Sequence, residues 1–310
     1  MSHEGFQMSL SVFWRPEGFT LDTIRQKRFI KTVDGDSIDI RMPIRMLSID
    51  TPEKSVTKTS SGLRRVDMET LMDPLADWIE SGESPVVPAL ANHLLPRLRR
   101  PNAAQAQWDA GAAATAAHDA IVEKRLTRPT GSKRAMFVRV ADERFEKFGR
   151  LLAYLAPSYT SDELATMTRR ERATFNFSFL ASGWAASFII YPSVPGERDL
   201  PMVQAEAKAA IDEGRGQWAD PLALAGYEYR MVEGLTVLFK KVQAGNRVSD
   251  SDRTGWISRY CADIETGLLY PPQLYVLVPP WNRLFLWPED VGTAVGRLNL
   301  TPAPEMGAVM

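Results

Sequence analysis

The sequence predicts an α+β protein, because its apolar residues follow strand spacing in some segments and helix spacing in others. Residues 37–42 and 44–49 alternate roughly between apolar and polar side chains, as half-buried strands do. Apolar residues recur at helical spacing within residues 67–80 and 85–100. Residues 111–126 are rich in alanine, the strongest helix former. A length of 310 residues with 45% hydrophobic content is enough for about two globular domains.

The remaining elements follow in chain order. Further strands are expected at residues 25–33, 134–140, 151–156, 187–191, 256–262, 268–270, 274–278 and 283–287. Further helices are expected at residues 163–182, 200–214, 221–244 and 289–298. The sequence T-S-D-E at residues 160–163 is a capping signature that opens the first of these helices, and Gly183 ends it.

Charge and cysteine content restrict the kind of protein. The net charge is −1, so any attraction to nucleic acid must come from local patches and not from the whole molecule. Cys261 is the only cysteine, which excludes an intrachain disulfide. The N-terminal residues lack the basic start and apolar core of a secretory signal, and no stretch reaches the ~18 apolar residues of a membrane span. We therefore expect a cytoplasmic protein with no membrane partner.

The stretch from residue 33 to residue 53 contains the candidate metal-binding and catalytic residues. Asp36 and Asp50 could hold a hard divalent cation through oxygen ligands. Glu53 could act on a water, and Arg45 could neutralise a phosphate oxygen. This combination suits metal-assisted attack on a phosphodiester, although ordinary turn and strand-end residues on a solvated surface would look the same. Arg45 and Asp50 also lie an odd number of positions apart, so one site for both requires a bulge or a sharp end to the strand.

Three stretches carry a family resemblance. They are D-G-D-S with R-M-L-S-I-D-T-P-E in residues 34–53, E-K-F-G-R-L-L-A-Y at residues 146–154, and the helix pair at residues 175–186 and 201–214, closed by Gln217 and Trp218. In this order they resemble the staphylococcal (thermonuclease-like) nuclease family, over residues 25–54 and 109–219. The resemblance implies a five-stranded, partly open β-barrel of OB type with helices packed on it.

The resemblance also implies roles for individual residues. Glu53 falls at the position of the water-positioning or general-base glutamate, and Arg45 and Arg150 at those of two phosphate-binding arginines. Asp36, Asp50 and the backbone carbonyl of Thr51 fall at the metal ligands, with Asp34 close to the metal shell. Lys147 and Tyr191 match substrate-binding positions. Two positions depart from the family: Phe148 replaces a tyrosine, and Ile189 replaces an aromatic hydroxyl. The implied cation is calcium, with magnesium and manganese left open.

Domain boundaries follow from these matches. We expect an N-terminal extension at residues 1–24 and a nuclease domain at residues 25–219. A helical insertion at residues 54–108 begins directly after Glu53, either as a lid on the site or as a neutral element packed beside the barrel. Residues 220–310 would form a small α+β unit or an extension packed on the nuclease domain.

The expected function is a metal-dependent nuclease that hydrolyses phosphodiester bonds of DNA, RNA or both. The competing hypotheses are a nucleic-acid-binding module with throttled catalysis and an effector nuclease activated by an unknown partner. Domains of this kind that have lost catalysis commonly lack one of the site residues. A complete site therefore favours the enzyme. All five are present here: Asp36, Arg45, Asp50, Glu53 and Arg150.

Overall fold

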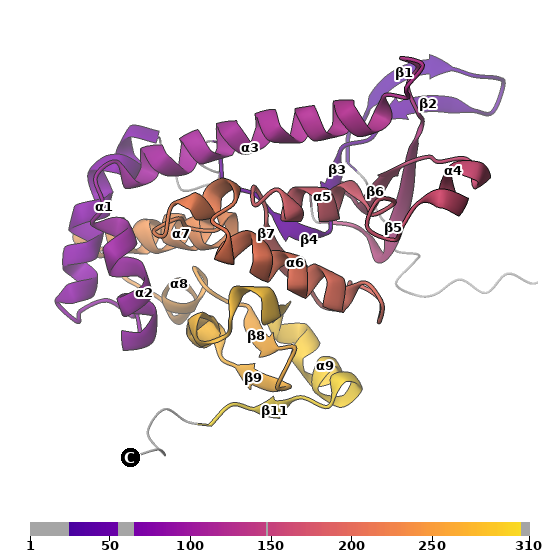
Figure 1. Ribbon diagram of the computed structural model, residues 1–310. Helices are drawn as coiled ribbons and strands as arrows, with labels where there is room; N and C mark the ends of the chain where they lie inside the picture. Colours follow the sequence, from indigo (N-terminus) through magenta and orange to yellow (C-terminus); the bar gives the residue numbers. More distant parts are fainter. Residues whose placement is uncertain (1–24, 55–64, 147, 305–310) are drawn as a thin grey trace, which may run out of the picture.

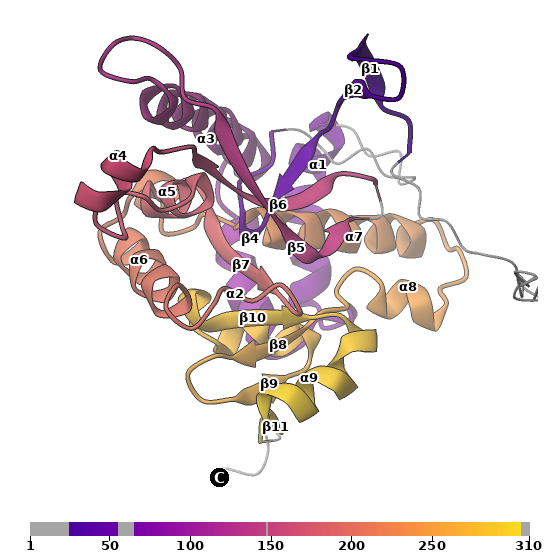
Figure 2. The same cartoon turned by 90° about the vertical axis from the view of Figure 1, so that its right-hand side faces the viewer.

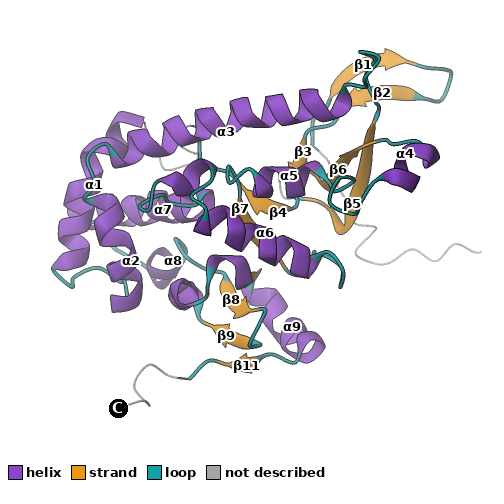
Figure 3. Cartoon of the chain, in the orientation of Figure 1, coloured by secondary structure: helices purple, strands orange, loops and turns teal. Residues whose placement is uncertain are grey.

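The computed structural model describes residues 25–54, 65–146 and 148–304 of the chain, and it confirms the α+β class (Figures 1 and 3). The strands are β1 Arg28–Thr32, β2 Ile38–Arg41, β3 Ile44–Met46, β4 Ser48–Asp50, β5 Met136–Phe145, β6 Leu151–Pro157, β7 Ala186–Ile190, β8 Tyr260–Asp263, β9 Leu268–Tyr270, β10 Arg283–Leu286 and β11 Thr301–Pro302. The α-helices are α1 Arg65–Glu80, α2 Pro88–Leu98, α3 Ala103–Leu126, α4 Ser161–Thr166, α5 Phe175–Ala181, α6 Leu200–Asp212, α7 Gly226–Gln243, α8 Asp250–Thr254 and α9 Val291–Leu298. Short 3₁₀ helices are η1 Gly216–Ala219, η2 Pro272–Leu277, η3 Pro280–Asn282 and η4 Pro288–Asp290.

The described strands form three separate sheets. Strands β1 and β2 pair only with each other, and this hairpin projects away from the other sheets in both views (Figures 1 and 2). The second sheet has the order β3-β6-β5, and the third has the order β11-β9-β8-β10-β7-β4. Among the described residues no closed barrel forms, so the five-stranded OB-type barrel stays a prediction.

The expected strand at residues 44–49 is divided between two sheets. Strand β3 pairs in parallel with β6, whereas β4 pairs antiparallel with β7. The division falls at Leu47 and Ser48, and Ser48 has φ = +60°, a left-handed conformation that turns the chain. The Ser48 hydroxyl is 2.6 Å from that of Tyr154 on β6, a hydrogen bond that joins the two sheets at the break.

The helical insertion belongs to the main hydrophobic core. Its helices α1 and α2 bury Met68, Leu75, Leu90 and Leu94 completely, in one cluster with the apolar face of α7. Because fully buried side chains of this size contribute about 1.5–3 kcal/mol each, these helices are held firmly in place. The insertion is therefore packed against the rest of the fold, and its role as a lid stays a prediction.

The C-terminal residues extend the sheet that holds β4. Strand β10 runs parallel to β7, with Leu284 opposite Ile189 and Phe285 opposite Ile190. The other edge of β10 pairs with β8. In Figure 2 these C-terminal strands lie next to β7 at the bottom of the molecule. Of the two arrangements expected for residues 220–310, the strand pairing corresponds to an extension of the preceding fold.

Some expected elements are wrong in type or extent. The expected strand at residues 274–278 is the 3₁₀ helix η2, because Pro271 and Pro272 open a tight turn that cannot donate ladder hydrogen bonds. The helix opened by the capping box at Thr160 ends at Thr166, and α5 starts only at Phe175. The helix expected from residue 221 begins at Gly226. The capping box itself is confirmed, because Thr160 and Glu163 exchange both hydrogen bonds.

Candidate active site

Asp50 forms the buried centre of a charged cluster. Its side chain is 0% exposed, and each carboxylate oxygen accepts a hydrogen bond from a different arginine. Arg45 Nη2 donates to Oδ1 at 2.5 Å, and Arg230 Nη2 donates to Oδ2 at 2.8 Å. Burial alone would raise the pKa of Asp50, but the charges of Arg230 and Arg45 outweigh burial and lower it. Asp50 is therefore an anion that holds two guanidinium groups in fixed positions.

The break in the chain at Ser48 explains how Arg45 reaches Asp50. On an unbroken strand, residues 45 and 50 would face opposite sides. Here the left-handed residue Ser48 rotates the chain between β3 and β4, and Asp50 returns to the side of Arg45. The sharp turn that the sequence required is present, and it lies between the two residues.

Glu53 lies just beyond β4 and is paired with an arginine from α7. Arg230 Nη1 donates to Glu53 Oε1 in addition to its bond to Asp50. The side chain of Glu53 is 25% exposed, so water reaches it, whereas Asp50 is sealed off. Burial would lower the pKa of Arg230, but the charges of Asp50 and Glu53 raise it, so this guanidinium stays protonated.

Two glycines allow helices to approach this segment closely. A Cβ on Gly111 of α3 would lie 2.6 Å from the backbone oxygen of Glu53, and a Cβ on Gly226 of α7 would lie 2.1 Å from that of Thr51. Both distances are shorter than any real Cβ contact, so only glycine fits at either position. Gln107, one turn before Gly111, fixes the segment further when its amide is assigned by its neighbours: the oxygen then accepts from the Glu53 N–H at 3.0 Å, and the nitrogen donates to the Leu224 carbonyl at 3.1 Å.

Arg150 approaches the cluster from the β5–β6 hairpin. It donates to both carboxylate oxygens of Glu146, at 2.6 and 2.9 Å. The pKa of Arg150 is raised, first by this hydrogen bonding, with a further contribution from the charge of Glu53 and an opposing one from Arg230. Arg45, Asp50 and Glu53 are thus joined by hydrogen bonds, the last two through Arg230. Arg150 is bonded to Glu146 instead and interacts with Glu53 and Arg230 only through their charges.

Arg259 adds a further cation behind Asp50. Its guanidinium lies over the rings of Phe188 and Trp287, 5.0 and 5.2 Å from their centroids. Burial and the nearby charge of Arg230 lower the pKa of Arg259 to about 10, while Asp50 acts in the opposite direction. Arg259 remains charged at neutral pH and adds positive potential to this side of the cluster.

The remaining predicted metal residues lie elsewhere. Asp34 and Asp36 are exposed in the turn between β1 and β2, where the Asp36 N–H donates to Asp34 Oδ1 at 3.4 Å. The Thr51 carbonyl faces the backbone of Gly226. In the described part of the chain, no group of three or more histidine, cysteine, aspartate or glutamate side chains is arranged to hold a metal ion. Both oxygens of Asp50 are occupied by arginines, so the expected ligand set does not fit a cation in this arrangement.

The predicted substrate-binding residues are not brought to the cluster either. Lys147 lies outside the described residues. Tyr191 follows β7 and is 7% exposed, within a hydrophobic cluster that also contains Ile189. It lies five residues beyond Ala186, the partner of Asp50, or about 16 Å along an extended chain. Phe148, at the position of the family's tyrosine, is 58% exposed.

Sequence reasoning missed Arg230 and Gln107, and it gave Glu146 and Arg259 no role at this site. One signal was available for Arg230. The segment from Gly226 to Phe239 is apolar on almost every side, and α7 is in fact buried nearly all round. A charged residue on such a helix requires a partner, because an unpaired buried charge is too costly. The partner itself lies 177 positions away and has no local signature.

Comparison with known proteins adds no assignment: the chain matches no protein-family model and no curated protein. Within the described residues, no helix is both long enough and apolar enough to cross a membrane.

Proposed function

We propose that this protein is a phosphodiesterase that cleaves nucleic acid, of the staphylococcal nuclease type that its motifs resemble. One observation carries the proposal. Three residues that the motifs single out, from β3, β4 and the following loop, are joined in one partly exposed cluster: Arg45, Asp50 and Glu53. Arg150, on the β5–β6 hairpin, interacts with Glu53 through charge. Ordinary solvated strand-end charges are not expected to be held together in this way.

Each side chain of the cluster has a role in the proposed reaction. Arg45, Arg150 and Arg230 are between 28% and 39% exposed, so N–H groups not used by carboxylates can bind phosphate oxygens. Glu53 orients a water and takes its proton as the water oxygen attacks phosphorus. The bond from phosphorus to the leaving oxygen breaks, and that oxygen takes a proton from solvent. The arginines stabilise the charge that develops on the phosphate, and buried Asp50 keeps them in position.

The proposal includes a closed form of the barrel. The β1–β2 hairpin exposes Phe29 and Ile38 on one face, each more than half exposed, and β5 exposes Met136, Val138 and Val140 on one face. Docking these two apolar surfaces on each other would remove both from water, which is favourable at about 25 cal/mol per Å². Docking would also carry Asp36 toward Asp50. For that form the resemblance implies a divalent cation, with calcium expected ahead of magnesium and manganese.

A nucleic-acid-binding module is the second candidate, and two observations favour it. Asp50 and Glu53 are both engaged by arginines, which is the arrangement expected of throttled catalysis. A cavity of about 660 Å³ beside β6 also combines cations with rings, as single-strand binding surfaces do. Its lining includes Arg139, Arg172, Phe137, Tyr154 and Tyr159.

Cleavage of labelled single-stranded DNA, duplex DNA and RNA separates these two functions. Each substrate is incubated with the full chain in calcium, magnesium, manganese or a chelator, beside Glu53→Gln. The hydrolase proposal expects products that depend on a cation and that fall about a hundredfold in the variant, the scale for loss of a general base. Glu83→Gln, in the exposed turn after α1, is the matched control and should cleave like the unmodified chain.

The outcomes are distinct. Unchanged cleavage by Glu53→Gln would refute the assignment of the general base. Binding of a labelled strand without cleavage under any condition would favour the binding module. Absence of both would reject nucleic acid as the substrate.

A further inference from the structure

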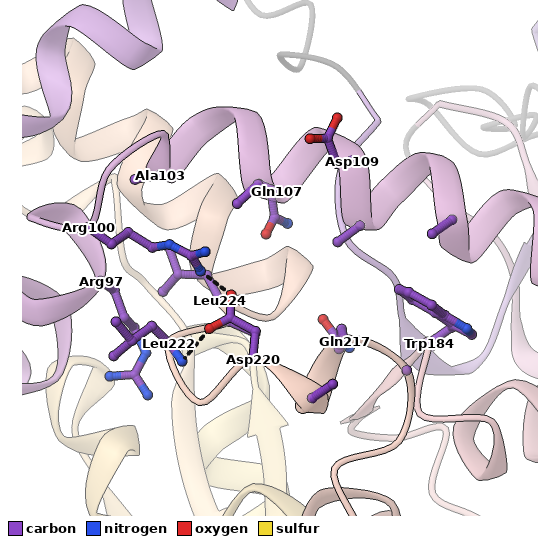
Figure 4. Close-up of a pocket in the computed structure, with 16 residues that line it drawn as sticks. Arg97, Arg100, Ala103, Gln107, Asp109, Trp184, Gln217, Asp220, Leu222 and Leu224 are labelled. Atoms are coloured by element: carbon purple, nitrogen blue, oxygen red, sulfur yellow. Dashed lines mark hydrogen bonds and ion pairs between the residues drawn. The ribbon is translucent and has the colours of Figure 1, made fainter.

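A cavity lies directly behind the candidate active site, on the other side of Gln107. It has a volume of about 430 Å³ and lies between α2, α3 and the segment from η1 to Leu224 (Figure 4). This volume is within the usual range of about 300–1,000 Å³ for small-molecule sites. None of the residues expected from the sequence to be catalytic or metal-binding lines it.

Gln217 is the feature of this cavity that calls for a ligand. Its side chain is 4% exposed, yet neither the oxygen nor the nitrogen of its amide has a hydrogen-bond partner among the described residues. Its backbone is fixed, because the Gln217 N–H donates to the Gly183 carbonyl at 3.1 Å. A buried amide left unpaired costs about 1–3 kcal/mol per group, so native proteins rarely keep one without a partner. A ligand that presents a donor and an acceptor side by side would pair both atoms.

The walls of the cavity suit a flat ring. Along α3 the lining side chains are mostly alanines, including Ala106 and Ala110, which leave space open against the helix. Trp184 supplies an aromatic face at one end of the cavity, opposite the end occupied by Arg100 (Figure 4). Aromatic faces bind planar heterocycles by stacking, at about 1–3 kcal/mol per nucleic-acid base.

The charges of the lining exclude a strongly charged ligand. Arg97 and Arg100 are balanced by Asp109 and Asp220, and Arg100 is paired with Asp220 (Figure 4). A phosphate would need an excess of positive charge that the cavity does not have. A neutral molecule meets no such obstacle, and the unpaired Nε of Arg97 offers it one more donor.

We propose that this cavity binds a neutral nucleobase or nucleoside. The ring lies against Trp184 and the alanine face of α3, and the amide-like edge of the base pairs with the donor and acceptor of Gln217. The assignment of a binding site stands independently of the proposed hydrolysis. Its consequence for activity rests on the proposed function: Gln107 lines the cavity and also holds the Glu53 backbone, so an occupant acts on the position of the catalytic carboxylate.

Isothermal titration of the full chain with adenosine, guanosine, cytidine, uridine and the corresponding 5′-monophosphates tests the site. At least one nucleoside is expected to bind, and more tightly than its monophosphate. Ala106→Leu fills the cavity and Gln217→Leu removes the pairing edge. Each should weaken binding about tenfold or more, the equivalent of losing roughly 1.4 kcal/mol. Ala112→Leu on the exposed side of α3 and Gln243→Leu at the end of α7 are matched controls that should bind normally.

Three results would overturn the proposal: no nucleoside binding at millimolar concentration, unchanged binding by Ala106→Leu, or tighter binding of the monophosphate. Cleavage assays with the bound nucleoside then measure the effect on Glu53. If the chain cleaves nothing under any condition, the hydrolytic function fails while the titration still decides the site. If cleavage occurs and the nucleoside leaves its rate unchanged, the link through Gln107 is refuted.

Discussion

Replacing Arg230 with leucine removes the side chain that, among the described residues, bonds both Asp50 and Glu53. Asp50 is fully buried and would keep only Arg45 as a partner, while Glu53 would lose its bond to α7. Removal of one member of a buried ion pair usually costs about 3–5 kcal/mol, because the other charge is left without compensation. Since Arg45 remains and Arg230 is 28% exposed, we expect the lower end, about 3 kcal/mol of unfolding free energy.

The pairing itself is isolated by a double-mutant cycle with Asp50→Asn. Each single variant leaves the other residue with one ion pair fewer, because Asp50 keeps Arg45 and Arg230 keeps Glu53, whereas the double variant removes both members of the Asp50–Arg230 pair. We expect about 3 kcal/mol for each single variant and about 4 kcal/mol for the double variant, which gives a coupling energy of about 2 kcal/mol. Urea unfolding followed by the fluorescence of the tryptophans measures all four proteins. Arg247→Leu, in the exposed loop after α7, is the control and should change stability by less than about 0.5 kcal/mol.

A coupling energy below about 0.5 kcal/mol would refute the reasoning, because that is the error of additivity for independent sites. It would mean that Arg230 and Asp50 do not form a pair in solution, and the role of Asp50 as the anchor of the arginines would be lost.

Four further predictions follow from the site and its surroundings. Arg150→Ala should lower turnover by about a hundredfold in the cleavage assay, because it removes a phosphate-binding guanidinium. Arg247→Ala is the control. Near-normal turnover of Arg150→Ala would show that Arg150 does not act in the site. Gly226→Ala places a Cβ 2.6 Å from Asp50 Oδ2, so urea unfolding should show a loss of about 1–3 kcal/mol, whereas Gly292→Ala, in open space, should show none. Ile38→Ser should reduce cleavage at least tenfold if the exposed hairpin docks on β5, while a hairpin that stays undocked predicts no change. Burial would raise the pKa of Glu228, but its hydrogen bond with His93 and the charges of His93 and Arg283 lower it to about 2. The stability that this contributes is complete above the ordinary value of 4.5 and is lost as the pH falls toward 2, so Glu228→Gln should reduce the pH dependence of unfolding in that window.

The local parts of the fold and the site could be predicted from the sequence. Arg45, Asp50 and Glu53 lie within nine positions of one another, so their meeting depends mainly on a short segment and the proline that ends its strand. The helices α1, α2 and α7 were predicted because their apolar spacing is a property of the segments themselves. The start of α4 was predicted because its capping box is contained within four residues, whereas its end at Thr166 was not.

The parts that depend on distant contacts could not be predicted. The left-handed conformation of Ser48 is unusual for a residue other than glycine, and it is held by β6 and β7 on either side. Arg230 pairs with residues 177 and 180 positions earlier, and the closeness of Gly226 to Thr51 exists only after α7 packs. The expected position of Asp36 beside Asp50 depends on how one hairpin docks, and residues in its own turn carry no information on that docking.

The long separation between Glu53 and Arg230 also sets a time at which the site can assemble during synthesis. A ribosome adds about 5–20 residues per second, so the 177 residues between them take roughly 9 to 35 seconds to appear. Until then Asp50 has no second arginine, Thr51 has no helix against it, and β7 with its C-terminal neighbours is incomplete. A nascent chain therefore carries the motif long before it carries the site, and any activity begins only when α7 has folded back onto the first strands.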